Sequence, residues 1–230
     1  MDCKCVISLG FRCFTEIFLK EMGIRQFSSP LGSLYLANVD DIILLLNNGI
    51  NYSKLYHTKY DIRFKKLNDK HGNRSIDMRL NKSLHKYNFD IKLQYDLATF
   101  AHHDMTLDKN IEHFNRCFNR IIKISKNKIR TLFCLFTFHK YLGYNILLNK
   151  DCIKLAKYLH DKFNCYLLII DFRKYSEKTK YRIIEKNNFY IRIQANSSRE
   201  EYHYNAEILD DIFYKLFKIN KEELLKYDEI

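Results

Sequence analysis

Apolar and polar positions along the chain predict a regular order of short strands and helices. Residues 5–9 form a short apolar run closed by Gly10, which is typical of a buried strand. Residues 11–22 then carry an apolar stripe at helical spacing, made of Phe14, Ile17, Phe18 and Met22. Gly23 comes directly after this stripe, where a helix commonly ends. The sequence therefore predicts a strand, a turn and an amphipathic helix at the start of the chain.

The second half of the chain alternates more clearly between apolar runs and amphipathic stretches. Strands are predicted at residues 130–138, 165–172 and 189–193. Further helices are predicted at residues 40–48, 107–124, 151–163, 177–186 and 206–219. The expected inward positions of the helix at residues 107–124 are Ile111, Phe114, Phe118, Ile121 and Ile122. Those of the helix at residues 151–163 are Ile153, Ala156, Leu159 and Phe163. This alternation predicts an α/β fold, with a mostly parallel sheet and helices on both faces.

Residues 51–96 have a poor pattern and are expected to form an irregular insertion or an edge region. Weak alternation favours strands at residues 57–64 and 87–95, with a turn at residues 71–73 between them. A further turn is expected at residues 28–32. No internal repeat or linker is apparent, so we expect residues 1–230 to form a single α/β domain.

The composition indicates a globular protein of the cytoplasm. Hydrophobic residues make up 47% of the 230 residues, and no apolar run approaches the length of a membrane span. No secretory signal is apparent at the N-terminus. The seven cysteines are odd in number and scattered, so we expect reduced thiols. A cytoplasmic location follows, in the host cytoplasm if the chain is viral.

The net charge of +12 makes nucleic-acid binding an alternative function. Lysines outnumber arginines 27 to 12, however, whereas residues that read phosphates and bases in bidentate fashion are more often arginines. The basic residues are also spread along the whole chain. We therefore expect nucleic acid to be an unlikely partner.

The stretch from Ser8 to Cys13 is the most informative for chemistry. A strand ends, Gly10 turns the chain, and Cys13 begins a helix. Ligands of open α/β sheets bind at the carboxyl ends of the strands. The free N–H groups and the dipole of a helix N-terminus stabilise a thiolate, and Arg12 adds positive charge. Cys13 is thus either a nucleophile or, equally compatible with the spacing, a small buried apolar residue.

A second group of polar residues precedes the helix predicted at residues 107–124. His102 or His103 could accept the proton of a cysteine nucleophile. Asp104 could orient an imidazole, or alternatively cap the helix together with Thr106. Competing candidates for a third catalytic role lie at predicted strand ends, although each is more commonly a cap or turn residue: Thr137, His139, Asp171 and Asn196. The histidines and cysteines match no familiar zinc spacing, so no metal and no cofactor are expected.

Two spaced motifs in the first 32 residues resemble a known family. They are Ser8-Leu9-Gly10-x-x-Cys13 and Leu19-x-x-x-Gly23-Ile24-Arg25-x-x-Ser28-x-Pro30. Both are similar to the opening signature of a bacterial and viral family of unknown function that is described as papain-like cysteine peptidases. A later His-Asp pair of that family is similar to His103-Asp104. Where the family has Pro-Phe-Asp-Trp, this chain has Pro30-Leu31-Gly32-Ser33, so an acid and a tryptophan are missing.

The resemblance implies a cysteine-dependent hydrolase that attacks a peptide, isopeptide or ester carbonyl through an acyl-enzyme. Cys13 would be the nucleophile, His103 the general base, and Asp104 or another acid would orient the base. The substrate would be a protein or peptide, and a host protein if the chain is viral. A non-catalytic protein-binding module derived from such a fold is the alternative, favoured by the missing acid. Papain itself joins a helical domain to an antiparallel barrel, whereas the pattern here predicts a parallel sheet.

Overall fold

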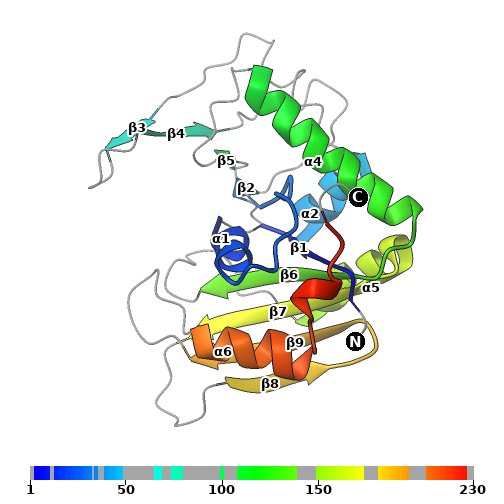
Figure 1. Cartoon of the computed structure of the whole chain (residues 1–230). Helices are drawn as coiled ribbons and strands as arrows, with labels where there is room; N and C mark the ends of the chain where they lie inside the picture. The colour runs from blue at the N-terminus through cyan, green and yellow to red at the C-terminus, as the bar shows by residue number, and fades with distance from the viewer. Residues whose placement is uncertain are drawn as a thin grey trace.

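The central element of the computed structural model is a five-stranded sheet with the order β1-β6-β7-β9-β8 (Figure 1). Its strands are β1 (Cys5–Ser8), β6 (Thr131–Phe138), β7 (Tyr166–Arg173), β8 (Tyr181–Lys186) and β9 (Tyr190–Asn196). The first three and β9 run parallel, and β8 pairs antiparallel with β9. The structure describes residues 3–10, 13–32, 34–35, 39–48, 65–68, 74–79, 99–100, 108–138, 149–173, 181–196 and 206–226.

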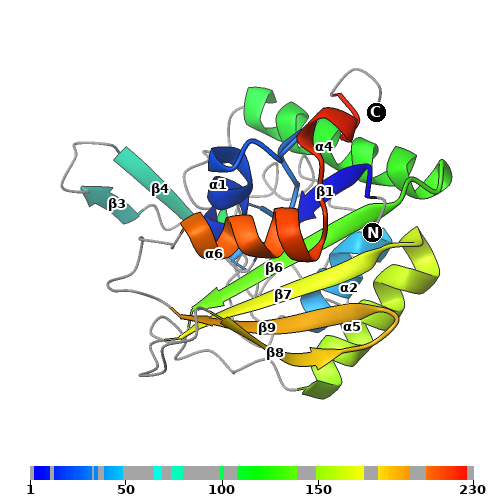
Figure 2. The same cartoon turned by 60° about the horizontal axis from the view of Figure 1, so that its bottom comes forward.

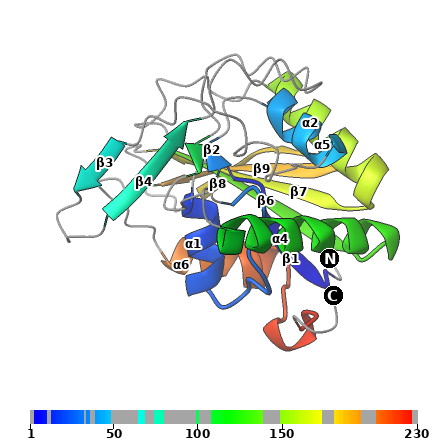
Figure 3. The same ribbon diagram turned by 90° about the horizontal axis from the view of Figure 1, so that it is seen from above.

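Helices cover both faces of this sheet, as the sequence predicted (Figure 3). One face carries α1 (Cys13–Glu21) and α6 (Ala206–Asp210), which continues as the π-helical η3 (Asp211–Leu216). The other face carries α2 (Val39–Asn48), α4 (Asp108–Lys126) and α5 (Asn149–Phe163). Successive residues from Leu132 to Phe136 of β6 enter alternate cores, which explains why this part of the strand is continuously apolar. The α/β class and the mostly parallel sheet are therefore confirmed.

One predicted element is wrong, because the segment predicted as a helix at residues 177–186 contains strand β8. This strand lies at the end of the sheet, and its register against β9 shifts between Ile183 and Glu185 (Figure 2). Ile183 and Ile184 are both exposed. The charged residues of the segment favour a helix locally, but pairing with β9 supplies the backbone hydrogen bonds instead, so tertiary context overrides propensity.

Three predicted inward positions are also wrong. Ile17 and Ile122 are each 41% exposed, and Ile153 is 46% exposed. Cys117 and Cys152 occupy the buried positions of α4 and α5 in their place. The apolar stripe of each helix is wider than the surface that contacts the sheet, so a residue at the border of the stripe faces solvent.

A smaller antiparallel sheet has the order β2-β5-β4-β3. Its strands are β2 (Leu34–Tyr35), β3 (Lys65–Asn68), β4 (Arg74–Arg79) and β5 (Thr99–Phe100). The strands predicted at residues 57–64 and 87–95 lie outside the described residues, as does the turn at residues 71–73. Within the described part of the chain, no helix is long and apolar enough to cross a membrane.

The outer edge of β1 is covered by two other segments. The Val6 N–H donates to Gln26 Oε1 at 3.1 Å. The Leu225 N–H donates to the Lys4 carbonyl at 3.0 Å, just after the short 3-10 helix η4 (Lys221–Glu223). An uncovered edge would offer these backbone groups to another chain. Gln26 and the C-terminal segment therefore protect the strand that leads into the candidate site.

Candidate active site

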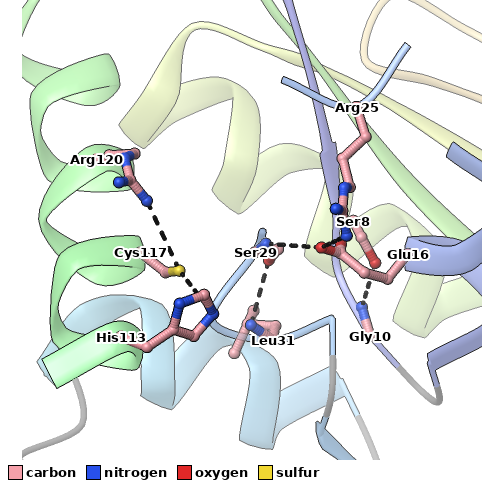
Figure 4. Close-up of polar contacts among 9 residues, drawn as sticks. All are labelled: Ser8, Gly10, Glu16, Arg25, Ser29, Leu31, His113, Cys117 and Arg120. Atoms are coloured by element: carbon pink, nitrogen blue, oxygen red, sulfur yellow. Dashed lines mark hydrogen bonds and ion pairs between the residues drawn. The ribbon is translucent and has the colours of Figure 1, made fainter. Parts of the chain in front are cut away.

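The chain turns at Ser8-Leu9-Gly10, where β1 ends. Ser8 Oγ accepts a hydrogen bond from the Gly10 N–H at 3.3 Å (Figure 4). Gly10 has a φ of 85°, a conformation that favours glycine. Between them, Leu9 is fully buried and its N–H donates to the Cys134 carbonyl at 2.9 Å. Each residue of the Ser8-Leu9-Gly10 motif therefore has a distinct part in ending the strand and turning the chain.

Cys13 is the first residue of α1, as the sequence predicted. The pairing of β1 with β6 ends at Ser8 and Cys134. Two residues further along β6, the Phe136 N–H donates to Thr15 Oγ1 at 3.1 Å. The Thr15 hydroxyl thus continues the ladder where β1 stops, and it holds the first turn of α1 at the carboxyl end of the sheet. Parallel sheets commonly bind ligands at this edge.

The other two residues of the predicted triad, His103 and Asp104, lie outside the described residues, as does His102. The described strand that precedes them is β5, which ends at Phe100. Phe100 pairs with Leu34 of β2. Of the predicted triad, the structure therefore describes only the helix start at Cys13. The catalytic roles of Cys13, His103 and Asp104 remain predictions.

Sequence analysis missed a buried acid one helical turn after Cys13. Glu16 Oε1 accepts hydrogen bonds from Arg25 Nη1 at 3.0 Å and from the Ser29 N–H at 3.2 Å (Figure 4). Oε2 of the same carboxyl is buried and has no hydrogen-bond partner among the described residues. Acidic residues are common in the first turn of a helix, where they interact favourably with the helix dipole. The sequence therefore offered no indication that Glu16 is buried.

The turn after α1 brings Arg25 back to this carboxyl. Gly23 has a φ of 69°, and the N–H groups of Ile24 and Arg25 both donate to the Leu19 carbonyl, at 3.1 and 3.0 Å. Such a turn ends the helix and reverses the chain. The Gly23-Ile24-Arg25 motif therefore has a structural role: its glycine allows the turn, and its arginine forms an ion pair with Glu16.

A second turn, predicted at residues 28–32, places Gly32 against the same carboxyl. The Gly32 N–H donates to the Ser29 carbonyl at 3.2 Å. A Cβ atom at position 32 would lie 2.5 Å from Glu16 Oε2 and 2.8 Å from its Cδ. The Glu16 carboxyl therefore fills the space beside Gly32, the position at which the similar family motif carries an acid.

Burial raises the pKa of Glu16 to about 7, although the Arg25 guanidinium and the Ser29 N–H lower it. Removal from water penalises the charged carboxylate more than these two donors stabilise it. Glu16 consequently changes its charge close to neutral pH, one helical turn from Cys13.

A thiol and an imidazole also meet on α4. Cys117 Sγ lies 3.6 Å from His113 Nε2, and Arg120 Nη1 lies 3.8 Å from the same sulfur (Figure 4). Burial raises the pKa of Cys117 to about 11, against the opposing effect of Arg120. Burial also lowers the pKa of His113, as do Arg116, Arg120 and Arg25. This pair therefore stays neutral near pH 7 and is not a source of a thiolate.

The cysteines whose side chains the structure describes are all buried as free thiols: Cys3, Cys5, Cys117, Cys134, Cys152 and Cys165. For five of these, burial raises the thiol pKa: Cys5, Cys117, Cys134, Cys152 and Cys165. A thiol in such surroundings is protonated at neutral pH and reacts slowly.

Asp171, a competing candidate for the third catalytic role, is bonded within the sheet. One of its oxygens accepts from the Thr137 hydroxyl, and the other accepts from Arg192 Nε at 2.7 Å. Arg192 also donates to Asn149 Oδ1 at 2.8 Å, and Asp171, Thr137 and Arg192 are all buried. This network joins β6, β7, β9 and α5 at the carboxyl edge. Among the described side chains, no three His, Cys, Asp or Glu residues gather as metal ligands.

The comparisons with known proteins agree with the motifs. A family model described as "Putative papain-like cysteine peptidase (DUF1796)" matches residues 4–139. The match begins just before β1 and ends just after β6, so it spans Cys13, Glu16, His103 and Asp104. No curated protein and no solved structure matches the chain.

Proposed function

The chain belongs to the family described as putative papain-like cysteine peptidases, and from that premise we propose that it is a cysteine-dependent hydrolase with Cys13 as its nucleophile. The Cys13 thiolate attacks a peptide, isopeptide or ester carbonyl and forms a thioester acyl-enzyme, releasing an amine or an alcohol. Water then hydrolyses the thioester and restores the thiol. The substrate is a protein or a peptide.

The observation that carries this proposal is the position of Cys13 at the start of α1, directly after the β1 turn. The first N–H groups of a helix have no partner within the helix, so they stabilise a thiolate and the oxyanion of a tetrahedral intermediate. The other six cysteines are buried. Burial disfavours the thiolate of five of them, Cys5, Cys117, Cys134, Cys152 and Cys165, which makes Cys13 the better placed cysteine for catalysis.

His103 is the proposed general base, and Asp104 the proposed acid that orients it. His103 follows Phe100 by three positions, a separation of at most about 11 Å along an extended chain. Phe100 pairs with Leu34, two positions after Gly32, whose Cβ position lies against the Glu16 carboxyl. This pairing supports an approach of the His103 segment to the first turn of α1.

A peptidyl acyloxymethyl ketone, which alkylates activated cysteine nucleophiles, tests the proposal. Mass spectrometry should find the probe on Cys13 of the wild type and on no residue of Cys13→Ala. His103→Ala should abolish labelling, whereas the matched variant His102→Ala should keep most of it. If the folded wild-type protein is not labelled, the proposal of a cysteine-dependent hydrolase is wrong. That result would favour a non-catalytic binding module. Labelling that needs His102 rather than His103 would overturn the assignment of the base.

A further inference from the structure

One oxygen of the Glu16 carboxyl, Oε2, has no hydrogen-bond partner among the described residues, although buried carboxyl oxygens normally accept hydrogen bonds. The Glu16 side chain is only 9% exposed, and Oε2 is itself buried. Oε1, by contrast, accepts from both Arg25 and Ser29. A buried polar atom without a partner costs free energy, so its retention at a candidate site calls for a function.

Glu16 lies three positions after Cys13 on a helix of nine residues. Residues with this spacing share one face of a helix, with Cβ atoms about 5–6 Å apart. We propose that Glu16 is a positioning residue of the Cys13 site, which holds the Ser29–Gly32 turn against α1 and sets the reactivity of the Cys13 thiol through its own charge. The proposal rests on the proposed function only in taking Cys13 as the reactive thiol.

The first part of the proposal follows from the contacts of the carboxyl. The Glu16 carboxyl accepts hydrogen bonds from Arg25, which follows the turn at the end of α1, and from the Ser29 N–H in the turn at residues 28–32. It thereby links α1 to both turns. A Cβ atom at Gly32 would overlap Oε2. The requirement for glycine at this position is thus one of space, created by the Glu16 side chain itself.

The second part follows from the charges that face Glu16. Arg25 approaches from the turn after α1, and Cys117 from α4 is close enough for the charge of Glu16 to affect its thiol. Cys117 is neutral near pH 7, and the titratable or charged groups of α4 that act on it or on its neighbour His113 are Arg116 and Arg120. Arg116 also pairs with Glu112.

Ionisation of Glu16 therefore places a negative charge one turn from Cys13, offset in part by Arg25. A nearby negative charge disfavours a second one, so the ionised carboxylate raises the pKa of the Cys13 thiol. The neutral carboxyl leaves the helix N-terminus free to stabilise the thiolate. The two groups consequently titrate as a coupled pair.

The rate at which iodoacetamide alkylates Cys13, followed by mass spectrometry from pH 5 to pH 9, tests this coupling. In Glu16→Gln we expect the apparent pKa of Cys13 to fall by about half to one unit. Because only about half of the wild-type protein carries the Glu16 carboxylate at pH 7, alkylation there should be less than about 2-fold faster in the variant, and the ratio should rise toward roughly 3–10-fold as Glu16 becomes fully ionised at higher pH. The matched control Glu21→Gln removes an exposed acid of the same helix and should leave the wild-type profile unchanged. Identical profiles for Glu16→Gln and the wild type would overturn the proposal.

A second measurement covers the case in which Glu16→Gln does not fold. Gly32→Ala should displace the carboxyl and lower the thermal midpoint of the otherwise wild-type protein. In a Glu16→Ala background, where the carboxyl is absent, the same change should cost much less. Equal costs in the two backgrounds would show that the carboxyl does not occupy the space beside Gly32.

The alkylation assay needs no substrate, so it separates this inference from the proposed hydrolase. A shifted profile in a protein that the peptidyl probe does not label would support the role of Glu16 and overturn the hydrolase. If the peptidyl probe labels the protein but the alkylation profile is unchanged in Glu16→Gln, the hydrolase is supported and the role of Glu16 is overturned.

Discussion

The Glu16 carboxyl lies in surroundings that favour its neutral form. Burial raises its pKa to about 7, even though Arg25 and the Ser29 N–H act in the opposite direction. An acid with a higher pKa in the folded protein than in the unfolded chain weakens folding as the pH rises. The contribution of this side chain to stability is therefore fully present only at acidic pH.

We expect Glu16 to lower the free energy of unfolding by about 3 kcal/mol between pH 4.5 and pH 7. Below pH 4.5 both states hold the proton. As the pH rises the unfolded chain releases it first, and the loss is complete once the folded protein has also ionised. Urea unfolding at several pH values should show that Glu16→Gln lacks this decline.

The exposed acid Glu21 provides the control for that measurement. Glu21→Gln should keep the pH dependence of the wild type, because the Glu16 carboxyl and its contacts are unchanged in that variant. A wild-type decline in Glu16→Gln would mean that some other group causes it.

The buried pair of Asp171 and Arg192 makes a second prediction at this scale. Both carboxylate oxygens of Asp171 are bonded, one to Thr137 and one to Arg192. Arg192→Met should lower the free energy of unfolding by about 3–5 kcal/mol, because it leaves a buried carboxylate without its counter-charge. Adding Asp171→Leu to that variant should restore part of the loss. Additive losses in urea unfolding would contradict this account.

At the scale of elements, the position of α1 depends on a hydrogen bond outside any strand pair. Thr15 Oγ1 accepts a hydrogen bond from the Phe136 N–H, just beyond the point where the pairing of β1 with β6 ends. Thr15 is fully buried, so no water replaces its hydroxyl if it is removed. The register between the helix and the sheet, and with it the place of Cys13, follows from this contact.

Thr15→Val keeps the shape of the side chain but removes the hydroxyl. We expect it to lower the free energy of unfolding by about 1–3 kcal/mol, since the Phe136 N–H is left buried and unpaired. Alkylation of Cys13 should also slow as the first turn loses its anchor. Thr15→Ser, which retains the hydroxyl, should keep the wild-type alkylation rate. Equal rates for Thr15→Val and Thr15→Ser would show that the anchor does not affect the thiol.

Elements buried on both faces could be predicted from the sequence, and the exposed edge strand β8 could not. The middle residues of β6 and β7, 132–136 and 167–170, are all apolar because each enters one core or the other. The edge strand β8 pairs with β9 and most of its residues are exposed, so it has no continuous apolar run. Ile122 and Ile153 lie at the borders of helical stripes, where the spacing alone does not decide burial.

The candidate site was predictable only where a motif carries it along the chain. Gly10 and Cys13 stand together in the sequence, and their turn and helix start were found. Glu16 takes its properties from Arg25, Ser29 and Gly32, which reach it through two later turns. Contacts made by chain reversal leave no periodic signal in the sequence.

At the scale of the whole molecule, the net charge of +12 is spread along the sequence. A diffuse positive charge attracts a polyanion through counterion release, which salt suppresses. Fluorescence anisotropy with a generic DNA duplex should therefore show weak binding that is lost steeply between about 50 and 200 mM salt. Tight binding that survives physiological salt would place nucleic-acid binding above the hydrolase.

The pairing of β1 with β6 also fixes when, during synthesis, the candidate site first exists. Thr15 and its partner Phe136 are 121 positions apart. A ribosome that adds about 5 to 20 residues per second needs roughly 6 to 24 seconds to bridge that interval. Until then β1 has no neighbouring strand, and α1 has no sheet on which to settle. A nascent chain therefore lacks the contact that positions α1, and with it Cys13, until more than half of the protein has been made. If the proposed function is correct, a product truncated before β6 has no hydrolase activity.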